Sequence, residues 1–203
     1  MNRFSLCLIF IISFIKVFSQ KGDDNLKYIT ELKEHQQDYK VELAGIIKKD
    51  TSFVSFYDVQ SAYRLEAVYE PLRNQPVFSM GTSSGKTKQA QKIGLVKFSI
   101  NNRTYQLSAY QLLALRTNPD QQDLFFIPFT DATSGEETYA TGRYLDFKLS
   151  DIKNGSSLVI DFNKAYNPYC AFVDGYNCPI PPPENQLQAH IKAGEKAYGK
   201  KWK

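Results

Sequence analysis

Residues 93–112 read IGLVKFSINNRTYQLSAYQL, and this stretch decides the fold class. The pair Asn101-Asn102 tolerates the positive φ angles that a two-residue hairpin turn requires. Pairing outward from the turn places Phe98 opposite Tyr105 on one face, and a slip of one residue would spoil the separation of apolar from polar side chains. We therefore predict an antiparallel hairpin here. The other near pairs are Val96 with Leu107, Lys97 with Gln106, and Ser99 with Thr104.

A second turn signal of the same kind is Asn154-Gly155. Pairing outward from it places Phe147 opposite Phe162 on the core face. The same register puts Arg143 on the core face at the far end of the strand, where its guanidinium needs a partner because burying an unpaired charge is very costly. The other predicted pairs are Leu149 with Ile160 and Lys148 with Asp161, the latter an ion pair. Candidate partners of Arg143 are Asp131, Glu136, Glu137, Glu184 or an anionic ligand.

Short apolar or alternating runs separated by turn residues fill most of the chain after residue 60, at the spacing of an antiparallel sandwich or barrel. We predict a mainly β fold, an antiparallel β-sandwich or flattened barrel, with one N-terminal α-helix and a long irregular C-terminal segment. The helix runs from Asp24 to about Leu43, where apolar residues beginning with Leu26 recur at helical spacing. The predicted strands are Ala62–Tyr69, Pro76–Met80, Ile93–Ile100, Thr104–Leu112, Leu124–Phe129, Arg143–Leu149 and Leu158–Asn163.

The first residues resemble a secretory signal peptide. Arg3 supplies a positive charge, the ten residues Leu6–Ile15 are largely apolar, and Val17-Phe18-Ser19 offers a cleavage site before Gln20. A helix of ten apolar residues is too short for a bilayer core, which takes about 20. We expect an exported protein, periplasmic or extracellular, in which residues 1–19 are the signal peptide, 20–45 a helical arm and 46–203 a single β domain.

The formal net charge of +4 is small for 203 residues. A nucleic-acid-binding protein usually carries a basic stripe, whereas the only dense basic cluster in this sequence is Lys200–Lys203. We therefore expect no nucleic-acid partner. After the signal peptide no apolar run approaches the length of a membrane helix, so no stable membrane span is expected either.

Removal of the signal peptide with Cys7 leaves Cys170 and Cys178. In an oxidising compartment an isolated pair of cysteines is typical of a disulfide. The alternative is a metal site completed by His35 or His190, but the spacing matches no structural zinc pattern. We predict a disulfide between the two cysteines, with no metal and no cofactor.

Polar and aromatic residues are concentrated between residues 131 and 195, and three functions are open for them. The first is binding of a small polar or anionic ligand, which aromatic rings and amide groups suit. The second is hydrolysis of envelope glycans or peptides by a pair of carboxylates, and the third is a structural or partner-binding role. The ligand-binding candidates are Arg143, Tyr144, Asn163, Tyr166, Asn167, Asn185 and Lys192; the catalytic candidates are Asp131, Glu137, Asp146 and Glu184.

This part of the chain contains specific short motifs. They include Asp131-Ala-Thr-Ser-Gly135, Gly142-Arg-Tyr-Leu-Asp146, Ala165-Tyr-Asn-Pro168 and Ile191-Lys-Ala-Gly-Glu195. Together they resemble an uncharacterised family of bacteria and archaea, the domain of unknown function family 1684. Lys192 stands where the family pattern leads us to expect arginine, a change that keeps the charge but loses the bidentate fork. The resemblance implies no activity, cofactor or catalytic residue.

Overall fold

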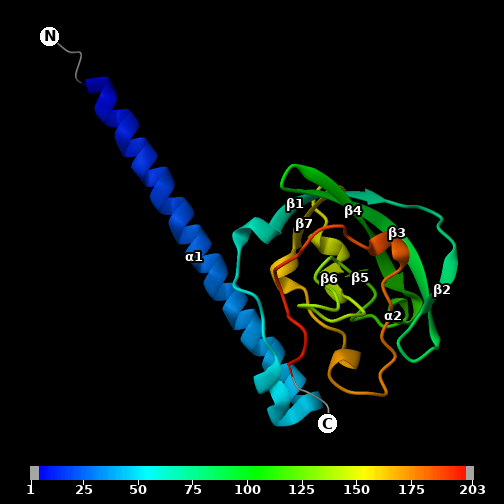
Figure 1. The fold of residues 1–203 in the computed structure, drawn as a ribbon. Coiled ribbons are helices and arrows are strands. Elements are labelled where there is room, and N and C mark those ends of the chain that lie inside the picture. Colours follow the sequence, from blue (N-terminus) through cyan, green and yellow to red (C-terminus); the bar gives the residue numbers. More distant parts are fainter. Residues whose placement is uncertain (1–4, 200–203) are drawn as a thin grey trace.

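The computed structural model of the chain describes the backbone of residues 5–199 and the side chains of residues 23–47 and 50–199. One long helix, α1 (Ser5–Ile47), precedes a seven-stranded antiparallel sheet, and a long irregular segment follows the sheet (Figure 1). The strands are β1 (Arg64–Pro71), β2 (Val77–Gly81), β3 (Thr87–Ile100), β4 (Arg103–Leu112), β5 (Leu124–Phe129), β6 (Arg143–Lys148) and β7 (Ser157–Asp161).

The sheet curls into a half-barrel around its core. Its strand order is β6-β5-β4-β3-β1-β7, and β2 pairs with β3 outside this path. Figure 1 shows the strands wrapping around the central β5 and β6 region. The mainly antiparallel β fold with one N-terminal helix is confirmed, and its form is a curled half-barrel. β6 and β7 are the two end strands of this path, so they form the two edges of the opening.

The hairpin predicted at Asn101-Asn102 is confirmed. Phe98 lies opposite Tyr105, and the two turn residues have φ angles of 49° and 61°. The predicted apolar face lies in the core, because Val96 and Leu107 have no exposed surface.

The hairpin predicted at Asn154-Gly155 is wrong. Both turn residues have positive φ, but the turn closes only an isolated bridge between Lys153 and Ser157. The 3-10 turn η3 (Leu149–Asp151) ends β6 and directs the chain away, so β6 pairs with β5, and β7 pairs with β1.

All three pairs predicted for this hairpin fail, because Phe147 lies opposite Phe125 of β5 and Ile160 opposite Leu65 of β1. Lys148 does not meet Asp161; instead, its backbone N–H donates to the Asp151 carboxylate at 2.8 Å. Leu149, which we expected in the core, is 44% exposed, since it lies in the 3-10 turn rather than in the strand.

The predicted helix of residues 24–43 is contained in the longer α1. Leu32 and Leu43 are buried, whereas Leu26 is 65% exposed, so the apolar stripe packs only from about the second turn of the predicted helix. The predicted signal peptide stays a prediction, because residues 1–4 and the side chains up to residue 22 lie outside the described residues, as does the Lys200–Lys203 cluster. No helix in the described part of the chain is long and apolar enough to cross a membrane.

The irregular C-terminal segment runs across one end of the half-barrel. It contains the predicted disulfide Cys170–Cys178. Near its end it pairs with the segment before β1: the Tyr57 N–H donates to the Gly194 carbonyl at 2.9 Å, and the Lys196 N–H donates to the Ser55 carbonyl at 2.9 Å. The segment therefore ties together the two ends of the β part.

Candidate functional site

A cavity of about 630 Å³ lies where α1 crosses the opening of the half-barrel. Its walls come from α1, from Leu145–Phe147 of β6 and from the outward side of β7, and the short 3-10 turn η4 (Phe162–Lys164) lies beside it. Leu145, Phe147 and Val159 supply apolar surface. The cavity is therefore built at the place where the sheet does not close on itself.

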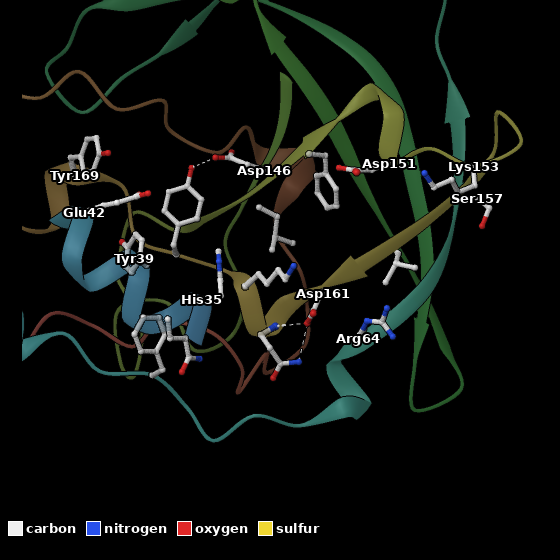
Figure 2. A pocket seen from close by; sticks show the side chains of 18 residues that line it. His35, Tyr39, Glu42, Arg64, Asp146, Asp151, Lys153, Ser157, Asp161 and Tyr169 are labelled. Atoms are coloured by element: carbon white, nitrogen blue, oxygen red, sulfur yellow. Dashed lines mark hydrogen bonds between the residues drawn. The ribbon is translucent and has the colours of Figure 1, made fainter. Parts of the chain in front are cut away.

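The two ends of the cavity differ in chemistry. Figure 2 shows Tyr39, Glu42 and Tyr169 at one end, and Arg64 and Lys153 at the other. The first end combines aromatic rings with a carboxylate. The second presents a guanidinium and an ammonium group beside the carboxylates of Asp151 and Asp161, so charges of both signs meet there.

Asp146 lies between the two ends and accepts a hydrogen bond from the Tyr166 hydroxyl at 2.7 Å. Solvent reaches Asp146 through the cavity, yet protein atoms crowd its carboxylate. This partial burial raises the pKa of Asp146, and the hydrogen bond from Tyr166 opposes the rise. Of the four carboxylates predicted as catalytic, Asp146 is the one that lines the cavity.

Asp161 is held in place by contacts from α1. The Tyr28 hydroxyl lies 2.9 and 2.8 Å from its two oxygens, and the Asn163 side chain donates to Oδ1 at 3.0 Å. Burial, followed by the hydrogen bond to Asp161, raises the pKa of Tyr28. This network fixes α1 against the end of β7, so it positions one wall of the cavity.

Two donors at the cavity have no protein partner among the described residues. The buried Nε2 of Gln36 makes no hydrogen bond, and the exposed Lys164 makes neither an ion pair nor a side-chain hydrogen bond in the described chain. Burial, and then the nearby positive charge of Lys164, lower the pKa of His35. The Lys164 ammonium is therefore available to an occupant of the cavity, whereas the Gln36 Nε2 has almost no accessible surface.

Arg143 lies away from the cavity and is fully buried. Its guanidinium forms an ion pair with Asp131 at 3.2 Å. It also donates to the carbonyls of Ile191 at 3.0 Å, of Glu195 at 3.2 Å, and of Ala193. Asp131 was one of the partners proposed for it from the sequence. The structure thus places Arg143 in a closed cage of protein acceptors.

The remaining predicted residues are distributed around the fold. Asn163 and Tyr166 line the cavity, whereas Asn167 and Asn185 are fully buried and hydrogen-bond to the backbone. Tyr144 donates to the Pro179 carbonyl. The ion pairs are Lys192 with Glu137 at 2.8 Å and Lys92 with Glu184 at 2.7 Å.

The predicted carboxylates therefore do not gather in one place: Asp131 is bound to Arg143, Glu137 to Lys192 and Glu184 to Lys92. No group of three or more His, Cys, Asp or Glu side chains in the described chain is arranged to hold a metal ion. Sequence reasoning missed much of the cavity, including His35, Gln36, Tyr39 and Glu42 from α1, and Arg64, Lys153 and Lys164.

A second buried acid lies behind the α1 wall. Glu195 has no exposed surface, and its Oε2 accepts hydrogen bonds from the Tyr39 hydroxyl at 3.0 Å and from the Asn167 N–H at 2.7 Å. Its Oε1 has no partner among the described residues. Burial raises the pKa of Glu195 to about 8, against the opposing effect of these hydrogen bonds. Tyr39 therefore connects the cavity to a carboxyl group that is protonated at neutral pH.

The sequence profile of the family described as "Protein of unknown function (DUF1684)" matches residues 50–196. The chain belongs to this family. The match spans β1 to β7 and the irregular segment through Lys196, but it begins after α1 ends. The α1 wall of the cavity, with His35, Gln36, Tyr39 and Glu42, thus lies outside the matched region.

The fold also resembles a solved structure. The solution NMR structure of an uncharacterized protein from Haloarcula marismortui superposes with a TM-score of 0.65 and 26% sequence identity, covering 86% of this chain and 96% of that chain. No curated protein matches the chain.

Proposed function

We propose that the protein binds a small polar ligand with an anionic group in the cavity between α1, β6 and β7. The observation that carries this proposal is the cavity itself. Its volume of about 630 Å³ lies in the range of known ligand sites, roughly 300–1,000 Å³, which combine apolar surface with a few convergent polar groups. Apolar surface from β6 and β7 and the polar side chains of Arg64, Asp146 and Lys153 meet that description.

The anionic group of the ligand is assigned to the end with Arg64, Lys153 and Lys164. None of these three cations forms an ion pair in the described chain. Arg64 lies over the Tyr28 ring, 5.3 Å from its centroid, and the Lys153 ammonium donates to the Ser150 carbonyl at 2.8 Å. Two carboxylates lie near these cations and already accept hydrogen bonds: Asp161 from Tyr28 and Asn163, and Asp151 from the Lys148 N–H.

Lys164→Gln is expected to weaken binding of such a ligand roughly tenfold, because a charge-assisted hydrogen bond contributes about 1.5–3 kcal/mol. The measurement is a thermal-shift titration of the protein with dicarboxylic acids, amino acids, sugars and phosphates. A ligand at 100 times its dissociation constant adds about 2.7 kcal/mol of stability.

The control for this titration is Lys86→Gln, which removes the same charge from the exposed turn between β2 and β3, outside the cavity. Binding that is weakened equally by both changes, or by neither, would speak against this site. A screen without any shift would remove the support for ligand binding altogether.

We further propose that the protein is exported. The signal-like N-terminus supports this, and the Cys170–Cys178 disulfide is compatible with an oxidising compartment. Expression of the full chain in a secreting bacterial host is expected to give a processed protein whose first residue is Gln20, read by N-terminal sequencing. Recovery of the unprocessed chain from the cytosol, with free thiols at both cysteines, would reject the export proposal.

A further inference from the structure

The half-barrel is open between its two end strands, β6 and β7. The end strands β6 and β7 both line the cavity, and the sheet order leaves each with only one partner strand. We call this opening the seam and define it as Leu145–Lys148 of β6 facing Ser157–Asp161 of β7. A bridge between Tyr144 and Tyr166 closes one end of it.

The ladder on β7 determines which of its backbone groups face the seam. The Tyr69 N–H donates to the Ser156 carbonyl at 2.7 Å, and the register continues with Ala67 opposite Leu158. Antiparallel ladders alternate between bonded and non-bonded pairs, so Val159 directs its N–H and carbonyl away from β1. This side of the strand faces the seam, where Val159 lines the cavity.

The same reasoning applies to β6. Tyr144 and Tyr166 exchange two backbone hydrogen bonds of 2.9 and 3.1 Å on the side of β6 that faces away from β5. By alternation, Asp146 directs its N–H and carbonyl to this side as well. In the described chain neither Asp146 nor Val159 makes a backbone hydrogen bond outside the ladders to β5 and β1. Their neighbours on the same side are already bonded, because Ser157 exchanges two backbone hydrogen bonds with Lys153 and the Lys148 N–H donates to the Asp151 carboxylate. One residue on each strand edge, Asp146 on β6 and Val159 on β7, thus offers a free N–H and carbonyl to the cavity.

We propose that the ligand of this cavity is a short peptide in extended conformation, which enters the seam as an added strand. This inference rests on the proposed function and specifies its ligand class. A strand rises about 3.3 Å per residue, so a peptide of five residues is about 16 Å long. Two neighbouring residues in its middle pair with Val159 and Asp146, one on each side. β6 and β7 run in opposite directions, and the peptide therefore lies antiparallel to one edge and parallel to the other. Addition of a strand to an open edge is a common mode of peptide recognition.

The charges of the cavity give the peptide a direction. Its carboxylate end faces Arg64 and Lys153, and its amino end faces Glu42 and the aromatic rings beside it. An ammonium group is favoured there both by the carboxylate and by the ring faces. Backbone pairing holds the peptide whatever its side chains are, while the apolar surface from β6 and β7 favours apolar residues in its middle. The cavity therefore suits short peptides with free ends.

The test is equilibrium dialysis of the full chain against a pool of random-sequence pentapeptides, with bound peptides counted by mass spectrometry. A matched pool carries N-methyl groups on the second and fourth amides, which keeps the side chains and the charged ends but removes backbone donors. Retention of the unmodified pool is expected to exceed that of the methylated pool at least about tenfold, in line with the loss of one or two hydrogen bonds.

Equal retention of both pools would overturn strand addition. Retention of free amino acids or dicarboxylic acids without retention of peptides would overturn the peptide inference while leaving ligand binding in place. If neither class is retained, the proposed function fails as well. Val159→Pro, which removes the N–H facing the seam at an edge position where proline is tolerated, is expected to abolish peptide retention. The methylated pool decides the question even where that variant folds poorly.

Discussion

Replacement of Arg143 by alanine is expected to lower the free energy of unfolding by about 3–5 kcal/mol, which is the cost of removing one partner of a buried ion pair. The change leaves the Asp131 carboxylate without its cation and removes the donors from the carbonyls of Ile191, Ala193 and Glu195. It also removes the packing of the guanidinium on the Phe129 ring, 5.3 Å away. A typical domain is stable by only about 5–15 kcal/mol, so this loss is a large fraction of the total stability.

Urea unfolding followed by circular dichroism measures this loss. The matched control is Arg64→Ala, which removes an exposed arginine without an ion pair and is expected to cost less than about 1 kcal/mol. The double variant Arg143→Met with Asp131→Asn removes both charges at once, so it is expected to be more stable than Arg143→Met alone. A loss of 1 kcal/mol or less in Arg143→Ala would contradict the closed cage.

The variant Glu195→Gln is expected to flatten the dependence of stability on pH. Burial raises the pKa of Glu195 to about 8 in the folded protein, from an ordinary value of 4.5. Its contribution is therefore fully present below about pH 4.5 and is lost as the pH rises to about 8, because the unfolded chain ionises first. At 1.36 kcal/mol per pKa unit, the loss between pH 5 and pH 8 is on the order of 3 kcal/mol. Glutamine imitates the neutral acid and avoids this loss.

The measurement is a set of denaturant unfolding curves of both proteins from pH 5 to pH 8. The two proteins are expected to be nearly equal at pH 5, and the variant the more stable at pH 8. The exposed Glu136→Gln serves as the control and is expected to follow the wild-type profile. Parallel profiles for Glu195→Gln and the wild type would show that Glu195 is ionised in the folded state at neutral pH.

The parts of the fold that depend on residues close together in the sequence could be predicted from it. The hairpin at Asn101-Asn102 is such a case, because a two-residue turn fixes the register of the strands that it joins. The disulfide belongs here too, since only one pairing is open to Cys170 and Cys178 once the signal peptide is removed. All seven predicted strands occur, each with its ends shifted by a few residues at most except β3, which begins earlier, at Thr87.

The partners of β6 and β7 could not be predicted in this way. Alternation of apolar and polar residues determines which face of a strand is buried, but any partner with the same pattern satisfies it. Phe147 of β6 and Ile160 of β7 are buried as expected. The two strands do not pair with each other, however: Phe147 lies opposite a residue of β5 and Ile160 opposite a residue of β1. The pairing of β7 with β1 is decided by tertiary packing, and the turn at Asn154-Gly155 is compatible with both arrangements.

The cavity was the feature that could least be predicted from the sequence. Asp146, Asn163 and Tyr166 belong to the set chosen from the motif-rich segment, whereas His35 and Gln36 come from α1 and carry no motif. Their position at the cavity follows from the docking of Tyr28 on Asp161, a contact between residues far apart in the chain. Strand parity predicted Arg143 at the far end of the core face, pointing into the mouth of the barrel. Only the packed C-terminal segment reveals that the side chain is fully buried and that backbone carbonyls complete its cage.

The cage around Arg143 also sets the order of events when the chain is made. The β3–β4 hairpin can form as soon as both strands have left the ribosome, because its contacts are local. Arg143, in contrast, must wait for the carbonyls of residues 191, 193 and 195, and the segment before β1 must wait for Gly194. Synthesis that stalls before this point leaves a charged side chain inside an unfinished core. Truncated copies that lack these carbonyls are therefore expected to fold less stably than the full chain, so the last folded residues complete the core as well as the surface.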